Sequence, residues 1–547
     1  MNKPLLPLLS IYLLVSCAST PSSVTKQSNL SSSSEEASFS SIATETKSET
    51  AESKETSTNE TPVSKTEEAI QSSSAAEPED NPFGSPSKPV GSDFLSLFDI
   101  ASDIKITLSL SEDVSEFISD YQSSRDDSTY HSVYLPCDFA LELNGEKYEM
   151  EEVGIRMKGN TSRRRFFEDG SIIDPVHFKL SFKATFDGEE FDRPILSQFK
   201  RSYTAEEKKA RKDRKLFGLE KLDLKYIPRN GNESDFHEPY AYSLFRDAGL
   251  LAPYASLGKM ELNCGEDSRV YDYEIVETVD KEFLKRRMGK SASQGDLYKC
   301  TYGRMGKADL ARQDAVTKEL DGNGYNIGSR DKEGRKIGVE DDWTLYHPSY
   351  DLKTNDSGEL SDFSNMVNYI NTMWDCTYAG GTKSMLESAL DMSYFLRFSA
   401  ATYLLGNFDD QRYNANNYYL YFLPDNGKAY YIPYDWDWCL GVDLNTDMAS
   451  RKPFDNKDMS RNEEVSNNVY LATILDRSND AVSYSKDAYK KEYRAQIDKL
   501  IGQGFLDYSS FLSYVETSPL DCCSKAKVRD YMEKKTETVN SDSSFRA

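Results

Sequence analysis

The order of hydrophobic patterns along residues 96–540 constrains the fold of this chain most. Five segments of the first half alternate apolar and polar residues and are rich in β-branched or aromatic side chains, which is typical of strands; they begin near residues 106, 139, 149, 177 and 221. Segments from residue 235 and from residue 393 show helical spacing instead. With no repeat or low-complexity break, this order predicts one α+β domain with a strand-rich lobe, a helix-rich lobe and a cleft between them.

The N-terminal residues predict export and a tether. Residues 1–17, MNKPLLPLLSIYLLVSC, join a lysine to a short apolar run, as in a secretion signal. The ending LVSC resembles a bacterial lipobox, so we expect a lipid on Cys17 that anchors the protein to the outer face of the cytoplasmic membrane; an unmodified Cys17 after a plain signal peptide is the alternative. Residues 18–95 are rich in Ser, Thr and Glu and predict a disordered linker.

Composition excludes several classes of partner and site. The chain has 66 Lys and Arg against 91 Asp and Glu, a net charge of −25, which argues against nucleic acid or anionic lipid as a ligand. Its 4 His are scattered and its 8 Cys form no CxxC pair, so no ligand set for zinc or an iron–sulfur cluster is apparent. Irregular cysteine spacing also argues against a disulfide framework. Metal chemistry through oxygen ligands remains open.

The stretch 406–441 carries the strongest chemical signal. Two aromatic runs, YYLYFL and AYYIPY, are joined by PDNGK and predict a β-hairpin. Asp409 and Asn417 precede it, and Asp435 and Asp437 follow it, so antiparallel pairing brings all four to one end. Carboxylate and amide oxygens suit Mg²⁺ or Mn²⁺. The alternative is that these aspartates only cap or solvate turns.

Several motifs in one order resemble the spore coat protein H (CotH) kinase family. They are NFD at 407, NYYLY at 417, and IPYDWD at 432 with a nearby Gly441. GIRMKGNTSR at 154, HFKLSF at 177, HEPYAYSLFRDAGLLAP at 237 and GDLYKC at 295 also fit, so the resemblance covers about residues 150 to 445.

The resemblance implies an atypical protein kinase fold and ATP-dependent phosphorylation of Ser or Thr in a protein. Such a transfer depends mainly on positioning and on neutralising phosphate oxygens with metal and cations. Carried over by motif, Asp409 is the catalytic base, Asn417 and Asp435 hold the metal, and Asp437 is a second ligand or a hinge. Asn414 is the alternative to Asn417, but Asn417 has the family's position directly before the YYLY strand.

The resemblance also supplies candidates for the ATP-binding residues. Lys179 is the first choice for the cation that contacts phosphate and Glu238 for the acid that orients it, with Arg156 and Lys158 as the nearest alternatives. Glu238 follows Asp235 by three residues, so a capping box is an equally good explanation. A solvated strand face is the alternative for Lys179. The chain has no GxGxxG, HRD or DFG motif, and residues 303–360 fit no motif.

Two functions remain open at this stage. The first is an enzyme that uses ATP and Mg²⁺ or Mn²⁺ to phosphorylate a protein with a Ser/Thr-rich segment. The linker itself is a candidate substrate because tethering raises its local concentration, although a plain spacer is the preferred explanation. The second is a catalytically silent cell-surface module that binds a protein or a polysaccharide. Three metal-competent groups at converging positions favour the enzyme.

Overall fold

The computed structural model describes residues 90–125, 127, 129–159, 162–228, 235–301, 308, 310, 350–355, 364–378, 381–442, 446–453 and 487–542. The expected signal sequence with Cys17, nearly all of the linker and most of residues 303–360 lie outside this part of the chain.

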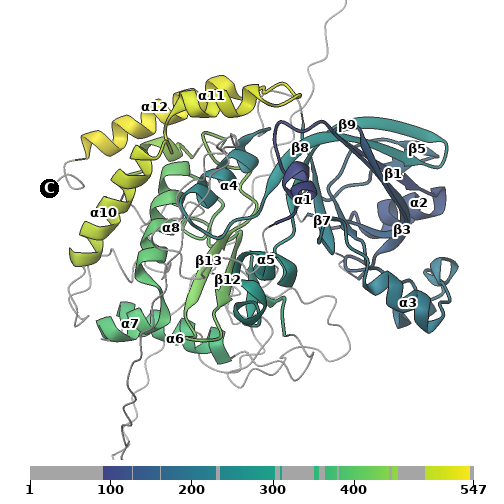
Figure 1. Cartoon of the computed structure of the whole chain (residues 1–547), viewed down its shortest axis with the longest axis horizontal. Coiled ribbons are helices and arrows are strands. Elements are labelled where there is room, and N and C mark those ends of the chain that lie inside the picture. The colour runs from purple at the N-terminus through teal and green to yellow at the C-terminus, as the bar shows by residue number, and fades with distance from the viewer. Residues whose placement is uncertain are drawn as a thin grey trace, which may run out of the picture. The chain divides into compact units, whose positions relative to one another are not determined.

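The N-terminal half of the described chain forms a closed seven-stranded barrel (Figure 1). The strand order is β1-β2-β3-β6-β7-β9-β8, and all neighbours are antiparallel except β1 and β8. The strands are β1 (Ile104–Leu110), β2 (Leu135–Leu143), β3 (Glu146–Met157), β6 (Phe178–Ser181), β7 (Lys221–Tyr226), β8 (Ala255–Cys264) and β9 (Asp267–Glu277). Short strands β4 (Phe167–Glu168) and β5 (Ser171–Ile172) and helices α1 (Ser92–Leu97), α2 (Glu112–Tyr121) and α3 (Ala205–Lys212) accompany it.

Burial along the strands explains the barrel. In β1 every second residue is buried, as the sequence pattern predicted, because that face covers the apolar core. Strand β7 differs, since four consecutive residues are buried. Leu222 and Leu224 belong to the barrel core, which leaves Asp223 and Lys225 on the opposite face of the strand. This turns two charged side chains of β7 toward the rest of the molecule.

The C-terminal half combines a second sheet with helices. The sheet has the order β11-β10-β12-β13 and consists of β10 (Leu297–Cys300), β11 (Tyr350–Leu352), β12 (Tyr418–Phe422) and β13 (Ala429–Pro433). Strands β12 and β13 pair as the predicted hairpin. The helices are α4 (His237–Asp247), α5 (Lys281–Ala292), α6 (Ser364–Tyr378), α7 (Lys383–Ala389), α8 (Met392–Leu405), α10 (Asp487–Gly502), α11 (Tyr508–Glu516) and α12 (Lys525–Ser541).

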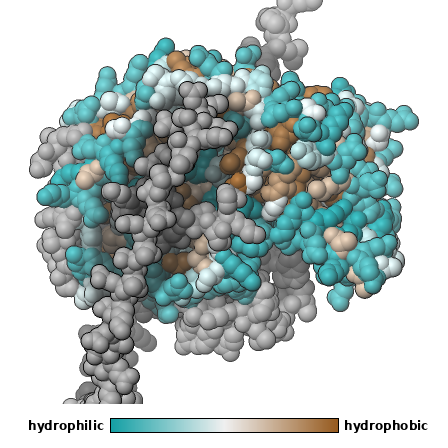
Figure 2. Space-filling view, in the orientation of Figure 1, coloured by the Kyte–Doolittle hydropathy of each residue, from teal (hydrophilic) through white to brown (hydrophobic). Residues whose placement is uncertain are grey.

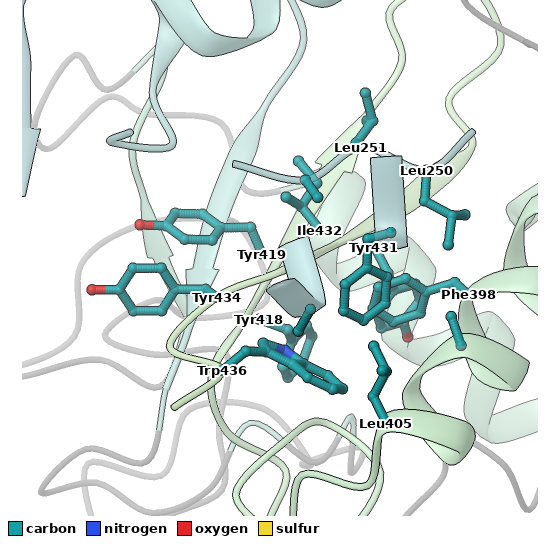
Figure 3. Close-up of a cluster of buried hydrophobic side chains, with 14 of the residues drawn as sticks. Leu250, Leu251, Phe398, Leu405, Tyr418, Tyr419, Tyr431, Ile432, Tyr434 and Trp436 are labelled. Carbon is teal, nitrogen blue, oxygen red and sulfur yellow. The ribbon is translucent and has the colours of Figure 1, made fainter. Parts of the chain in front are cut away.

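Aromatic side chains of the hairpin fill the core of this half. Tyr431 lies near Phe398 of α8, with ring centroids 5.5 Å apart (Figure 3). Trp436 packs against Phe245 of α4, with centroids 4.8 Å apart. Helix α8 ends at Gly406, whose φ of 63° is the left-handed conformation that glycine adopts without strain. The end of α8 and the packing of Trp436 therefore fix the two ends of residues 406–436, the segment that carries the predicted catalytic residues.

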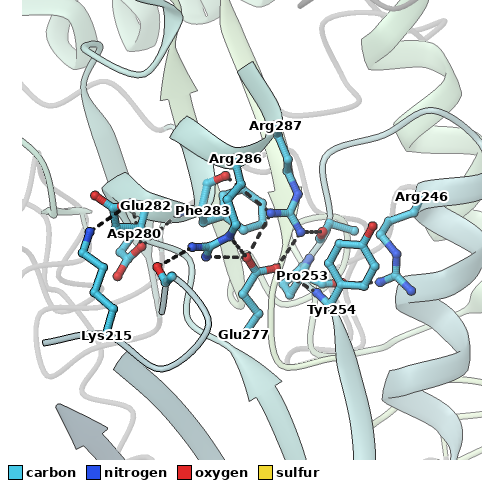
Figure 4. Close-up of polar contacts among 12 residues, drawn as sticks. Lys215, Arg246, Pro253, Tyr254, Glu277, Asp280, Glu282, Phe283, Arg286 and Arg287 are labelled. Atoms are coloured by element: carbon cyan, nitrogen blue, oxygen red, sulfur yellow. Dashed lines mark hydrogen bonds and ion pairs between the residues drawn. The ribbon is translucent and has the colours of Figure 1, made fainter. Parts of the chain in front are cut away.

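A buried ion-pair network joins the end of β9 to α5 (Figure 4). The Glu277 side chain is fully buried and contacts Arg286 at 2.6 Å and Arg287 at 2.5 Å, and it also accepts a hydrogen bond from the backbone of Tyr254. Because both guanidinium groups converge on one carboxylate, the connection between the barrel and α5 is held by charge as well as by packing.

The exterior of the described part of the chain is mostly polar, and its cysteines are thiols. On the face seen in Figure 2, hydrophilic residues predominate around small apolar areas. Within the described ranges no helix combines the length and apolar character needed to cross a membrane. The seven cysteines of this part of the chain form no disulfide, and five of them are buried.

Candidate active site

Lys225 of β7 is the centre of a cluster of carboxylates. Its ammonium lies 2.7 Å from Oδ1 of Asp435 and 3.4 Å from Oδ2 of Asp437, and it also donates to Oε2 of Glu238. The lysine is almost fully buried. Burial would lower the pKa of Lys225, but the three carboxylates raise it well above its usual value, so the side chain is a permanent cation.

The two aspartates after the hairpin have opposite protonation tendencies. Burial alone would raise the pKa of Asp435, but Lys225 and Lys158 hold it well below the ordinary value. The pKa of Asp437 is raised to about 7, because burial and repulsion from Asp435 and Glu238 exceed the attraction of Lys225. Asp435 is therefore the ionised member of the pair at neutral pH. Both do more than solvate a turn, since each contacts Lys225.

Helix α4 positions Glu238 through Tyr242, one turn further along. The Tyr242 hydroxyl donates a hydrogen bond to Oε1 of Glu238 and accepts one from the backbone N–H of Asp435, at 3.0 Å. His237 adds a second link, because its Nδ1 lies 2.7 Å from the carbonyl oxygen of Cys439. These contacts bind the first turn of α4 to the segment after the hairpin.

Asp409 lies in the turn after α8 and is held by three amides. Asn414 donates to its Oδ1 at 2.5 Å, Asn417 donates to its Oδ2 at 2.9 Å, and Asn416 contacts both oxygens. Burial raises the pKa of Asp409 even though these amides lower it, and the charge of Asp435 raises it further. A carboxylate with a raised pKa and a fixed orientation suits a general base.

The oxygen groups fit a divalent cation. One carboxylate oxygen each from Glu238, Asp435 and Asp437 lie within 4.8 Å of one another. Oδ1 of Asp437 is buried without a hydrogen bond, and the nitrogen of Asn417 is used by Asp409, which leaves its oxygen as the ligating atom. This donor set is of the kind that Mg²⁺ and Mn²⁺ take. Asp435 and Asp437, together with Glu238, are thus the residues whose oxygens lie close enough together to hold the ion, and Asn417 remains a predicted ligand.

The structure brings Asp409 together with Asn417 and gathers Glu238, Asp435 and Asp437 around Lys225, whereas Lys179, Lys158 and Arg156 make other contacts. Lys179 ion-pairs with Asp223 at 3.0 Å, whereas the lysine on Glu238 is Lys225. Lys158 also contacts Asp223. Arg156 donates to the carbonyl oxygen of His131 at 2.7 Å and stacks on Tyr134.

The capping box suggested for Glu238 is wrong. Phe236 is the N-cap of α4, and no side chain caps that helix. Asp235 instead accepts hydrogen bonds from the Ser524 hydroxyl and from the backbone of Cys523, at the start of α12. The glutamate is free of a capping role and pairs with Lys225.

Sequence reasoning missed Lys225, although it recognised the strand that carries it. The separation along the chain could have identified it. Lys225 precedes Glu238 by 13 residues and lies on β7, the strand directly before the helix that carries Glu238. An ion pair between a helix and the strand just before it needs no long connection. Lys179 was preferred because its segment resembled a family motif.

Comparison with known proteins assigns the chain to a family of kinases. A family model described as CotH kinase protein matches residues 188–509, so the chain belongs to that family. This match contains Lys225, Glu238 and the whole hairpin region, and it begins after Lys179. Comparison with curated proteins gives no match. Among solved structures, the crystal structure of the Helicobacter pylori proinflammatory kinase CtkA is similar with a TM-score of 0.26 and 12% identity, over 58% of this chain and 84% of that chain.

Proposed function

We propose that this protein is an atypical kinase that transfers the γ-phosphoryl group of ATP to Ser or Thr of a protein, with Mg²⁺ or Mn²⁺. The observation that carries the proposal is the contact of Lys225 with Glu238, Asp435 and Asp437 close to the amide-held Asp409. Phosphoryl transfer needs a cation on the phosphates, oxygen ligands for a metal and a base for the hydroxyl. The barrel and the helical half would be the two lobes of a kinase-like fold.

Each residue has one task in this mechanism. Glu238 holds Lys225, whose ammonium binds phosphate oxygens. Asp435, Asp437 and Asn417 would hold a divalent ion, which would neutralise charge on the transferred group. Asp409 accepts the proton of the substrate hydroxyl, and Asn414 and Asn416 keep its carboxylate oriented. Lys225 and the metal would contact the same carboxylates. When the nucleotide binds, Lys225 would therefore give up part of its carboxylate contacts and bind phosphate oxygens instead.

Labelled phosphate transfer from ATP to a Ser-rich acceptor tests the function. We expect transfer that requires Mg²⁺ or Mn²⁺, and an Asp409→Asn variant that still binds nucleotide but transfers on the order of 10²-fold to 10⁴-fold more slowly. Asp425→Asn is the matched control, because Asp425 is exposed at the turn of the same hairpin. Equal transfer by Asp409→Asn eliminates the base. Thermal stabilisation by a glycan and not by nucleotide would favour the binding module instead.

We further propose that the enzyme works outside the cytoplasmic membrane, anchored by lipid on Cys17, with residues 18–95 as its tether. The lipobox-like ending LVSC and the linker composition support this. Globomycin-sensitive processing and loss of membrane association in Cys17→Ser are the expected results. If the linker is also a substrate, labelled phosphate appears within residues 18–95 at a rate that does not depend on protein concentration.

A further inference from the structure

Two adjacent cysteines differ from the other thiols of the described chain. Cys523 is exposed and Cys522 is half-buried, whereas the other five described cysteines are buried. The pair lies between α11 and α12, directly before Ser524, the N-cap of α12. The transfer proposed above uses neither thiol. A reagent in solution can therefore reach a dithiol that has no part in the candidate active site.

A buried carboxylate holds this dithiol in place. Asp235 is almost fully buried and accepts hydrogen bonds from the Cys523 N–H and from the Ser524 hydroxyl. The Cys522 thiol lies 3.5 Å from Oδ1 of Asp235. That same oxygen accepts a hydrogen bond from the N–H of Phe236, the N-cap of α4, at 2.9 Å. The dithiol segment therefore ties the start of α12 to the start of α4.

Helix α12 extends this connection to the other side of the candidate active site. It lies along the helical half of the molecule (Figure 1). Its Tyr531 hydroxyl donates a hydrogen bond to the carbonyl oxygen of Leu404 at 2.9 Å, in the last turn of α8. One end of α12 is thus linked to the helix that carries Glu238, and its middle contacts the helix that leads to Asp409.

Adjacent thiols can undergo disulfide exchange with a small disulfide, R–S–S–R. Burial and the charge of Asp235 raise the pKa of Cys522 to about 11, so the exposed Cys523 reacts first. Its thiolate attacks one sulfur, forms a Cys523–S–S–R bond and releases R–S⁻. The Cys522 thiolate then attacks the Cys523 sulfur and releases the second R–S⁻. The two cysteines are oxidised, the small disulfide is reduced, and both thiol protons end on two molecules of R–SH.

We propose that Cys522 and Cys523 are a reversible oxidation site, at which this exchange closes a disulfide between adjacent residues and loosens the start of α4. Consecutive Cα atoms lie about 3.8 Å apart, less than the usual separation of about 4.4–6.8 Å in a disulfide. The ring is therefore strained, and a thiol reopens it readily.

The link to α4 follows from the contacts of Asp235. Ring closure consumes the Cys522 thiol and turns the peptide whose N–H donates to Asp235. The carboxylate then stays buried with two contacts fewer, which is unfavourable. Since Asp235 directly precedes the N-cap of α4, the first turn of that helix opens more often. Oxidation at this site does not require kinase activity, because neither thiol takes part in the proposed transfer.

Glutathione disulfide added to the reduced whole protein tests the site, with mass spectrometry of the peptide that contains residues 522 and 523. In the wild type we expect this peptide to lose two hydrogens and to carry no glutathione, and dithiothreitol should restore it. In Cys522→Ser, which lacks the second thiol, glutathione should stay on Cys523. Cys264→Ala is the matched control, because Cys264 is buried in β8 and its loss should change neither product.

Amide hydrogen exchange measures the effect on α4. Residues 236–242 should exchange about tenfold faster or more in the oxidised wild type than in the reduced one, as for the loss of one charged hydrogen bond. Cys523→Ser should show the slow exchange with and without glutathione disulfide. Because Cys523 is exposed, the reduced variant should unfold at the same temperature as the reduced wild type.

Three results would overturn the proposal. Glutathione that stays on Cys523 of the wild type would show that the two sulfurs do not meet. Thiols that glutathione disulfide leaves unmodified would show that the site is closed to oxidants. A ring that forms while α4 exchanges at its former rate would show that Asp235 does not transmit the oxidation. Mass and exchange are measured without ATP, so absence of phosphoryl transfer would overturn the kinase function and leave this site unaffected.

Discussion

Replacing Lys225 by methionine should destabilise the protein in a manner that a divalent cation reverses. The substitution keeps the length of the side chain and removes its charge, so Glu238, Asp435 and Asp437 face one another with oxygens within 4.8 Å. At an effective dielectric constant of about 20, two unit charges at that distance repel by about 3 kcal/mol. Removal of one partner from a buried ion pair typically costs about 3–5 kcal/mol, and we expect a loss in that range at pH 8.

Denaturant unfolding of wild type and Lys225→Met, with and without Mn²⁺ and at two pH values, measures this loss. The crowded carboxylates gain raised pKa values in the folded variant, so the folded state binds more protons than the unfolded state and stability falls as pH rises. The deficit should therefore shrink from pH 8 to pH 5.5. Mn²⁺ at about 100 times its Kd should restore about 2.7 kcal/mol to the variant and less to the wild type, in which Lys225 competes for the carboxylates.

Lys259→Met controls for the loss of one lysine, since Lys259 is exposed and its contact with Asp272 is 3.9 Å long. Its free energy of unfolding should change by less than about 0.5 kcal/mol. A loss below about 1 kcal/mol in Lys225→Met, together with equal Mn²⁺ stabilisation of both proteins, would refute the idea that Lys225 and the metal share one set of carboxylates.

Three further substitutions test the fold around the site. Glu277→Gln leaves two partly buried arginines without their fully buried carboxylate and should lower the free energy of unfolding by about 3–5 kcal/mol, measured with denaturant. Burial raises the pKa of Asp410 to about 7, so the folded protein binds a proton that the unfolded chain has lost. The free energy of unfolding of the wild type should therefore fall, relative to Asp410→Asn, by on the order of 4 kcal/mol as the pH rises from 3.8 to 7. Parallel pH profiles of the two proteins would contradict this. Gly406→Ala should lower the thermal midpoint, because φ is 63° and the new Cβ would lie 2.1 Å from the Tyr531 hydroxyl oxygen; an unchanged midpoint would show that α12 moves freely.

The sequence predicted the elements that local patterns specify. Five of the seven barrel strands (β1, β2, β3, β6 and β7) and the hairpin follow alternation and turn signals, and α8 follows from helical spacing with Gly406 at its end, whereas β8 and β9 were not predicted. Closure of the barrel was not predictable, because β1 pairs with β8 across more than 150 residues and no local signal encodes that contact. Asp435 and Asp437 follow the second hairpin strand directly, so the pattern that predicted the hairpin also predicted their position.

The basic residues of the site could not be found in the same way. A strand pattern shows which residues share a face, but it does not show which face meets the other sheet. In β7 four buried residues follow one another, so both faces are covered and alternation gives no preference. Lys179 and Lys225 both lie on barrel strands and each pairs with a carboxylate. Only the three-dimensional arrangement decides that Glu238 pairs with Lys225 and not with Lys179.

Tyr242 explains why the two halves of the site depend on one another. Its phenol donates to Glu238 and accepts from the backbone of Asp435, so one oxygen fixes both the carboxylate partner of Lys225 and the start of the segment that carries Asp435 and Asp437. Burial and the charge of Glu238 raise its pKa well above the usual value, which keeps the hydroxyl proton in place at any physiological pH. A displacement of α4 therefore shifts Lys225 and Asp435 together, because both are held through this one helix. In the proposed kinase, in which one carboxylate cluster would serve a lysine and a metal, such coupling would keep the two cations in a constant relation to the phosphate.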